Sequence, residues 1–225
     1  MEASVTHLRA RRGRILGLPR ISTYTDVVYF YRRSGEAAER IGILAGSFNP
    51  PTIAHLELVH AAGGYVDEVV CVVPRVLPHK PYFGATLEQR IEMLEAAGLD
   101  VPHSIGVAEG GLFAEIAEEC RAHYPDETRF YFLCGRDAAE RIIGWDYGEP
   151  GAIQRILREF ELLVAPRGGP FEAPPELRER VHALPIRDGY HEVSSTEVRD
   201  RIARGESWEH LVPQRIVAMV RAIYS

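Results

Sequence analysis

Residues 45–55 read Ala-Gly-Ser-Phe-Asn-Pro-Pro-Thr-Ile-Ala-His. The apolar run at 41–44 precedes them, and Leu56 and Val59 follow. The pattern predicts a buried strand, a sharp turn at the glycine and the two prolines, and a helix with His55 about one turn inside. Free N–H groups and the positive end of the helix dipole meet at such a turn, where an anion can bind. Because histidine adds a donor that can titrate near neutral pH, the stretch predicts a phosphate-binding site.

Outward from this turn, apolar strands alternate with helical patterns along the chain. Thr86 with Gln89 and Ser194 with Glu197 form capping-box patterns that mark two helix starts. Strands separated by helices predict a Rossmann-like α/β fold, a doubly wound parallel sheet with helices on both faces. Ligands of such sheets bind beyond the carboxyl ends of the strands. The expected strands are 41–45, 68–73, 104–107, 129–134 and 160–165, and the expected helices are 52–62, 86–97, 112–124, part of 137–143, 152–159, 195–204 and one from 213 onward.

Composition limits the classes of protein that fit. The chain has 225 residues, 46% of them hydrophobic and evenly spread, which suits one globular α/β domain over residues 40–225. No apolar run is long enough to span a bilayer, and the start lacks a secretory core. The net charge of −6 argues against a general nucleic-acid partner. Three scattered cysteines, Cys71, Cys120 and Cys134, match neither disulfide nor zinc spacing, so a reducing cytoplasm is expected.

The first 39 residues differ from the rest. Residues 1–40 carry eight arginines against four acidic residues. A basic arm for an anionic partner and a solvated, partly disordered extension both fit this pattern. The run at 27–31 could add an edge strand to the sheet. The sequence therefore predicts an extension over 1–39 with no assigned role.

Lysine usage singles out one residue. Lys80 is the single lysine among the 26 basic residues, and it lies in the Pro-rich loop 75–84. Where arginine serves every other need for positive charge, a lone lysine in a loop near the expected phosphate site is a candidate for a specific role. An ordinary solvated loop lysine is the alternative.

Four segments together resemble the nucleotidyltransferase superfamily, and within it the nicotinate or nicotinamide mononucleotide adenylyltransferases. The resemblance covers residues 40–224 and keeps the order of the motifs in that family. The segments are Gly46-Ser47-Phe48-Asn49-Pro50 with Thr52 and His55, Leu77-Pro78-His79-Lys80, Gly135-Arg136-Asp137 with Trp145, and Val193-Ser194-Ser195-Thr196-Glu197-Val198-Arg199.

The resemblance implies an ATP-dependent enzyme that transfers AMP to a pyridine mononucleotide and releases pyrophosphate. It implies that His55, Lys80 and Arg199 act on the reacting phosphates, with Mg²⁺ held mainly by phosphate oxygens and no dedicated protein metal site. The implied partners are ATP and a mononucleotide, without nucleic acid or membrane, and a homo-oligomer is possible. The implied ATP-binding residues are Gly46, Ser47, Phe48, Thr52, Gly135, Asp137, Ser194, Ser195 and Thr196, and the implied acceptor-binding residues are Trp145, Leu112 and Phe113.

Structural alternatives remain open for several of these residues. Thr52 is also a good helix N-cap, and Asp137 is also a favourable charge at a helix start. Trp145 could equally be a core residue. His55 could be a core histidine bonded to backbone, and Arg199 could make an ordinary surface ion pair.

The resemblance is weakest in the part that would select the acceptor. Bacterial members of the family usually carry Ser-Tyr-Thr before the Gly-x-Asp strand, whereas residues 110–113 read Gly-Gly-Leu-Phe. This difference removes hydroxyl groups but could leave the backbone donors in place. The same chemistry on another phosphate acceptor, such as phosphopantetheine, therefore stays open, as does a nucleotide-binding sensor without catalysis.

Overall fold

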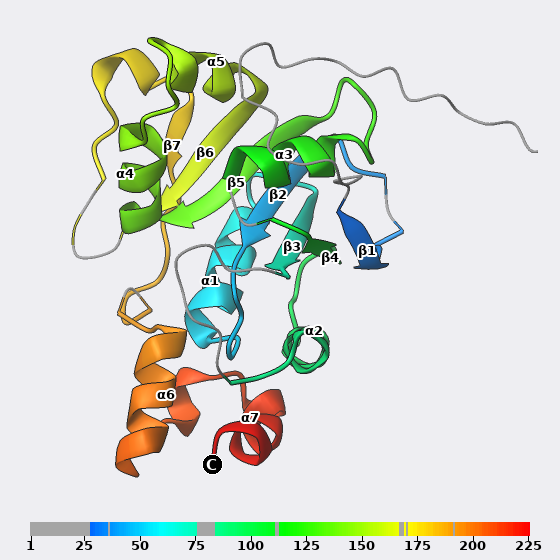
Figure 1. Ribbon diagram of the computed structural model, residues 1–225, viewed down its shortest axis with the longest axis vertical. Coiled ribbons are helices and arrows are strands. Elements are labelled where there is room, and N and C mark those ends of the chain that lie inside the picture. Colours follow the sequence, from blue (N-terminus) through cyan, green and yellow to red (C-terminus); the bar gives the residue numbers. More distant parts are fainter. Residues whose placement is uncertain are drawn as a thin grey trace, which may run out of the picture.

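The computed structural model describes residues 28–35, 37–75, 84–110, 113–166, 169, 171–190 and 192–225. Within these residues one seven-stranded sheet runs in the order β1-β4-β3-β2-β5-β6-β7 (Figure 1). Neighbouring strands pair in parallel, except that β1 is antiparallel to β4. The strands are β1 (Tyr29–Arg32), β2 (Arg40–Ala45), β3 (Glu68–Pro74), β4 (His103–Ala108), β5 (Arg129–Gly135), β6 (Phe160–Ala165) and β7 (Val181–Ala183).

Helices cover both faces of this sheet, which confirms the predicted doubly wound fold. Ile116, Ile142 and Leu157, from α3, α4 and α5, pack into one core cluster with β2, β5 and β6. Val59 of α1 and Leu94 of α2 pack into a second cluster on the other face. The helices are α1 (Ile53–Ala62), α2 (Leu87–Ala96), α3 (Phe113–Arg121), α4 (Arg136–Gly144), α5 (Ala152–Glu159), α6 (Ser195–Arg204) and α7 (Val217–Tyr224), with 3₁₀ turns at Pro175–Leu177, Glu209–Leu211 and Gln214–Ile216.

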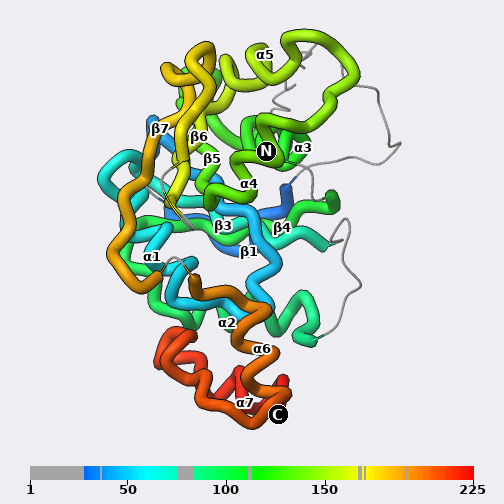
Figure 2. Tube along the Cα trace, turned by 90° about the vertical axis from the view of Figure 1, so that its left-hand side faces the viewer, coloured from blue at the N-terminus to red at the C-terminus, as the bar shows by residue number. Residues whose placement is uncertain are grey.

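A third apolar cluster joins α6 and α7 to α2. Met93, Val198, Trp208 and Val220 are buried in it. Figures 1 and 2 both place α6 and α7 together at the end of the molecule away from α5. This cluster fixes the position of α6, which carries the Ser-Ser-Thr motif, relative to the sheet.

The strand order creates a switch point between β2 and β5. From β2 the chain proceeds to β3 and β4 on one side, and β5 and β6 then continue on the other side. Ligands of open α/β sheets bind at such a switch point, beyond the carboxyl ends of the strands. The Gly46 turn follows β2 and Gly135 ends β5, so both motifs begin at that position.

The expected strands and helices are present, most with bounds that differ by one to three residues from the expected ones. The edge strand expected at 27–31 is Tyr29–Arg32, and its pairing with β4 makes this part of the predicted extension continuous with the sheet. The three-residue strand β7 was missed because it is too short to show a period. The last helix starts at Val217 rather than 213, after a 3₁₀ turn. Residues 1–27 of the predicted extension lie outside the described residues.

The two capping boxes formed to different extents. Thr86 Oγ1 accepts from the N–H of Gln89 (3.2 Å), and the Gln89 side chain accepts from the N–H of Thr86 (2.8 Å). Ser194 Oγ likewise accepts from the N–H of Glu197 (3.1 Å). The Glu197 carboxylate, however, pairs with Arg201 one turn later (2.5 Å), because an arginine four residues away is a competing partner.

All three cysteines are free and buried. Burial raises the pKa of Cys71 and of Cys134 to about 12, and burial also raises the pKa of Cys120. Cys71, Cys120 and Cys134 therefore pack in the core as small apolar side chains. The described residues also include no helix long and apolar enough to cross a bilayer.

Candidate functional site

The turn after β2 has an unusual backbone. Gly46 donates its N–H to Val72 O of β3 (3.1 Å). The turn therefore begins directly where β2 stops pairing with β3, at the carboxyl ends of the strands. Phe48 follows with a positive φ of 47° and a fully buried ring, and the Asn49–Pro50 peptide is cis. A bulky residue in the left-handed region is uncommon and persists only where its surroundings enforce it. Here the buried Phe48 ring is packed against the His55 ring, 5.0 Å between centroids.

His55 is held by the residue that caps its helix. Both the backbone N–H of Thr52 (3.0 Å) and Thr52 Oγ1 (2.8 Å) contact His55 Nδ1. Since an N–H group can only donate, Nδ1 acts as the acceptor, and this assigns the ring proton to Nε2. Nε2–H is then a fixed donor, set by the geometry of the cap.

Thr52 serves this arrangement from a buried position. It is fully buried, has extended backbone and directly precedes α1. Thr52 is therefore the N-cap residue of α1, which was one of the two roles that the sequence left open. Its hydroxyl contacts the His55 ring. Its contact with ATP stays a prediction.

The Ser-Ser-Thr motif at the start of α6 contacts the turn that follows β2. Ser195 Oγ donates to Pro50 O (2.8 Å), and Arg199 Nη1 donates to Asn49 O (2.6 Å). Arg199 Nη2 also contacts Thr196 Oγ1 (3.2 Å). The structure therefore brings the start of α6 and the His55 turn together, although about 145 residues separate them along the chain. This places hydroxyl, guanidinium and imidazole groups at one edge of the sheet.

Three side chains that support this turn were missed by the sequence reasoning. The Asn49 carboxamide oxygen accepts from the N–H of Ala85 (3.1 Å) and from the hydroxyl of Tyr224. Arg90, only 1% exposed, donates to Ser47 O (3.2 Å) and Pro74 O (3.4 Å). The one available signal was that Arg90 lies next to Ile91 on the apolar side of its helix, where a charged residue needs a partner.

Gly84 gives a direct test of how tightly this turn is packed. Its φ is +101°, and a Cβ there would lie 2.8 Å from Asn49 Oδ1 and 2.9 Å from the Tyr224 ring. We expect Gly84→Ala to lower the free energy of unfolding by about 1–2 kcal/mol, through the backbone strain and the contact with Asn49. Urea denaturation measures this. Gly189→Ala is the matched control, because Gly189 also has positive φ (+90°) but open space around it; equal losses in both variants would contradict the packing argument.

An ion pair between a buried carboxylate and an exposed guanidinium connects the segment that leads to α6 with α1. Glu57 of α1 is 2% exposed, and it accepts from the backbone N–H (2.9 Å) and Nε (2.8 Å) of Arg187. These hydrogen bonds lower the pKa of Glu57 against the opposing effect of burial. Because Arg187 lies seven residues before Ser194, the pair ties the approach to α6 onto the helix that carries His55. No sequence signal linked the two residues, which are 130 positions apart.

The motif after β5 lies at the neighbouring strand end. Gly135 caps α4, and Asp137 occupies the first turn, where its charge also suits the helix dipole. Trp145 follows the end of α4 with 55% of its surface exposed, so it is not the core residue that the sequence left open. An exposed indole is available for stacking on a base.

The structure describes one of the three predicted site residues that remain. Phe113 packs edge-on against Phe132 (4.6 Å between centroids), which accounts for its ring by core packing. Its part in binding the acceptor stays a prediction. Lys80 and Leu112 lie outside the described residues.

Comparison with known proteins identifies the group to which these motifs belong. A family model described as cytidylyltransferase-like matches residues 43–201. The chain belongs to the cytidylyltransferase-like family. Within this family it is 31% identical over 204 residues to a protein of Gloeobacter violaceus named "Probable nicotinate-nucleotide adenylyltransferase", covering 83% of this chain and 96% of that protein. A Bordetella pertussis protein of the same name is 30% identical over 196 residues, covering 80% and 94%.

Two solved structures have a similar fold. Nicotinic acid mononucleotide adenylyltransferase of Plasmodium falciparum, in complex with APC, superposes with a TM-score of 0.62 at 18% identity, covering 82% of this chain and 96% of that one. Its complex with NaAD gives a TM-score of 0.60 at 17% identity, covering 82% and 90%. At these identities the likeness establishes the shared fold.

The donor set of the site bears on metal binding. No group of three or more His, Cys, Asp and Glu side chains in the described part of the chain is arranged to hold a metal ion. Asp137 is the acidic residue of the motif segments that lies at this strand edge. One carboxylate suits Mg²⁺ that arrives with a polyphosphate and keeps most of its phosphate and water ligands.

Proposed function

We propose that this nucleotidyltransferase transfers AMP from ATP to nicotinate or nicotinamide mononucleotide, releasing pyrophosphate and forming the dinucleotide of NAD biosynthesis. The observation that carries the proposal is the joining of α6 to the His55 turn, through Ser195 and Arg199. Relatives at 30–31% identity that match over nearly their full length bear the corresponding name.

The reaction requires the protein to position the two substrates and to neutralise the charge on their phosphates. An oxygen of the acceptor phosphate attacks the α-phosphorus of ATP, a new P–O bond forms, and the bond to pyrophosphate breaks. A phosphate monoester has a second pKa of about 6, so the nucleophile is already an anion and needs no general base. The site must hold the groups in line and offset the developing charge.

The residues fit these tasks as follows. His55 offers Nε2–H to the reacting phosphates, with its tautomer held by Thr52. The start of α6 offers N–H groups, hydroxyls and the Arg199 guanidinium to the leaving pyrophosphate. Lys80 would add a mobile charge from its loop. Asp137 would order the nucleotide, and Mg²⁺, bound with ATP, would neutralise phosphate charge.

The backbone of the first motif completes the ATP site in this proposal. Gly46, Ser47 and Phe48 would present main-chain groups to the nucleotide at the strand end. Trp145 would stack on the base of the acceptor, with Leu112 and Phe113 beside it. Gly135 would allow close approach of the nucleotide at the end of β5.

Pyrophosphate release with ATP and Mg²⁺ tests the proposal, with nicotinate and nicotinamide mononucleotides in parallel reactions. Product from either substrate is expected, and the ratio of the two kcat/KM values gives the acid or amide preference. If the protein binds ATP but forms no product with either mononucleotide, the proposal that the acceptor is a pyridine mononucleotide is wrong. Phosphopantetheine in a third reaction would then separate another acceptor from a sensor role.

A further inference from the structure

A charged hollow lies at the edge of the sheet opposite the candidate site. Its volume is about 180 Å³. Arg129 begins β5, Glu161 is the second residue of β6 and Arg180 directly precedes β7, so the hollow lies at the amino ends of the strands, away from the candidate site. The charged residues lining it are Arg121, Arg129, Arg158, Glu159, Glu161 and Arg180.

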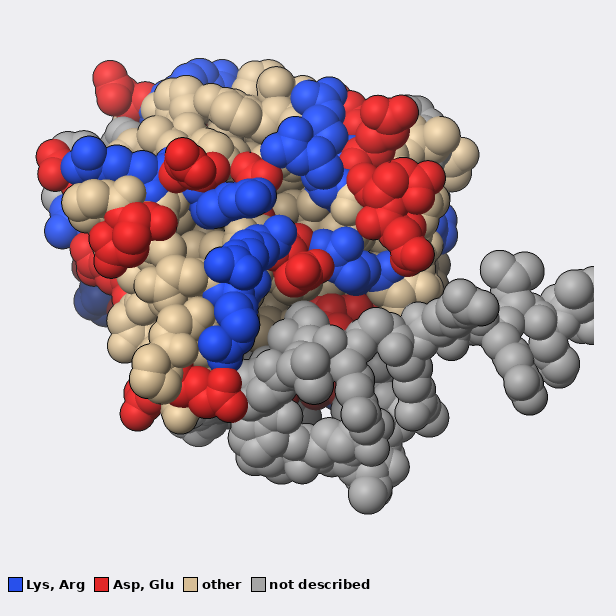
Figure 3. All heavy atoms as spheres, turned by 90° about the horizontal axis from the view of Figure 1, so that it is seen from above, with Lys and Arg blue, Asp and Glu red and all other residues tan. Residues whose placement is uncertain are grey.

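The charges of this hollow do not balance. Four guanidinium groups face two carboxylates, which leaves two positive charges in excess. Figure 3 views the molecule from this side and shows basic side chains gathered across it, with acidic ones beside them. A small hollow with an excess of positive charge attracts anions.

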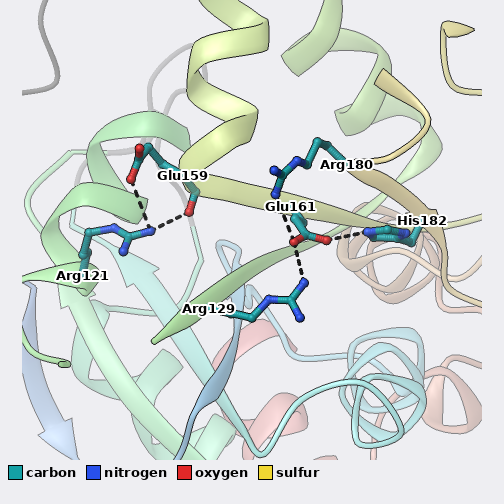
Figure 4. A network of polar contacts seen from close by, with 6 residues as sticks. All are labelled: Arg121, Arg129, Glu159, Glu161, Arg180 and His182. Carbon is teal, nitrogen blue, oxygen red and sulfur yellow. Dashed lines mark hydrogen bonds and ion pairs between the residues drawn. The ribbon is translucent and has the colours of Figure 1, made fainter. Parts of the chain in front are cut away.

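One carboxylate holds several of the cations in place. Glu161, with its side chain 10% exposed, accepts from Arg129 (2.8 Å), is 3.4 Å from Arg180 and contacts His182 Nε2 (2.6 Å). Figure 4 shows these side chains converging on it. Burial by itself would raise the pKa of Glu161, but the hydrogen bonds from Arg129 and His182 lower it, so the group is ionised at neutral pH.

Two further guanidinium groups line the hollow. Arg121 is held in place, because it lies against the rings of Phe130 (4.7 Å) and Phe160 (5.1 Å), donates to Glu159 O (2.5 Å) and lies 3.8 Å from the Glu159 carboxylate. The exposed Arg158 side chain makes no hydrogen bond or ion pair with a described residue. The arginines that are already held lose less entropy when a ligand binds, whereas Arg158 contributes a charge that no carboxylate offsets.

We propose that this hollow, which we name the amino-edge arginine site, binds a small phosphate-class dianion through Arg121, Arg129, Arg158 and Arg180. The two excess positive charges match the charge of a phosphate group at neutral pH. A guanidinium group can also donate two parallel hydrogen bonds to two phosphate oxygens. The volume is below the roughly 300 Å³ at which pockets for larger ligands begin, which favours a phosphate group over a whole nucleotide. This site is independent of the proposed function.

Amide NMR shifts of the full chain test the site, with inorganic phosphate as the probe and ionic strength held constant with sodium chloride. Saturable shifts at Thr128, Arg129 and Glu161 are expected. Arg158→Gln should weaken binding about tenfold, the scale of one charge-assisted hydrogen bond, and Arg158→Glu should weaken it further. Since the Arg158 side chain makes no hydrogen bond or ion pair with a described residue, Arg158→Gln should leave the fold intact, and the amide spectrum of each variant without phosphate checks this.

Arg155→Gln is the matched control, because Arg155 lies on the same helix but pairs with Glu149 outside the hollow (2.6 Å). It should bind like the wild type. A parallel titration with ribose 5-phosphate shows whether free phosphate or a phosphate ester binds better. Phosphate bound at the catalytic edge would instead move Gly46 and Ser195. Absent shifts at the amino edge, or equal affinity in wild type and both Arg158 variants, would overturn the proposal.

Discussion

His55→Ala is expected to lower kcat for adenylyl transfer by about 10²–10³-fold, the scale for loss of one fixed donor to a charged transition state. Thr52 holds Nδ1 as an acceptor, so Nε2–H is oriented before substrate binds. Because such a donor acts most strongly on charge that develops during the reaction, kcat and kcat/KM should fall together while the KM for ATP changes little. Steady-state pyrophosphate release measures both parameters.

Two further variants separate catalysis from folding. His60→Ala is the matched control on the same helix, since His60 is exposed and pairs with Asp100 (2.7 Å), and it should keep full activity. His55→Gln restores an acceptor for the N–H of Thr52, as in a capping box, and should recover stability with at most partial activity. Wild-type turnover by His55→Ala would contradict the role assigned to the ring.

Arg187→Ala is expected to lower the free energy of unfolding at pH 7 by more than the loss of a fully exposed ion pair, because it removes the guanidinium from a Glu57 side chain that is only 2% exposed. The loss should depend on pH. In the wild type the pKa of Glu57 lies below its unfolded value of about 4.3, so the pair stabilises the protein above that pH and the benefit is lost as pH falls further. In the variant the side-chain hydrogen bonds and the charge of Arg187 no longer lower the pKa of Glu57, so the pKa rises from its wild-type position and this contribution to stability is lost.

The difference in unfolding free energy between wild type and Arg187→Ala should therefore stay constant from pH 7 to about 5 and shrink as pH falls below the unfolded pKa of about 4.3. Urea denaturation at several pH values measures it. In a Glu57→Gln background the same substitution should cost much less, because no buried charge remains. Arg204→Ala, which breaks the exposed pair of Arg204 with Glu206 (2.8 Å), should cost much less than Arg187→Ala, because solvent screens both charges. A loss for Arg187→Ala that does not change with pH would mean that packing, and not charge, accounts for it.

Much of the fold could be predicted because its signals are local. The helix Ala152–Glu159 and the strand Phe160–Ala165 have the expected bounds, since apolar periodicity and turn residues mark them within a few positions. The edge strand β1 was harder to place because its pairing with the distant β4 stabilises it, and β7 was missed because three residues are too few to show a period.

The candidate site also has a part that local sequence specifies and a part that depends on distant segments of the chain. Within residues 45–55 the chain itself specifies a strand, a turn and a helix start with His55 at its third position, because each depends on near neighbours. The tautomer of His55 also depends on a contact three residues away. The meeting of Arg199 with Asn49 O, and of Arg187 with Glu57, depends on chain segments 150 and 130 positions apart.

The sequence by itself thus determined the family motifs, the order of strands and helices, and the residues with suitable chemistry. Only the tertiary structure decided which of them meet, because the packing of α6 and α7 on α2 and the strand order around β2 and β5 are long-range outcomes. It also placed four arginines around one hollow at the amino ends of the strands. Those arginines come from separate elements, and no local pattern connects them.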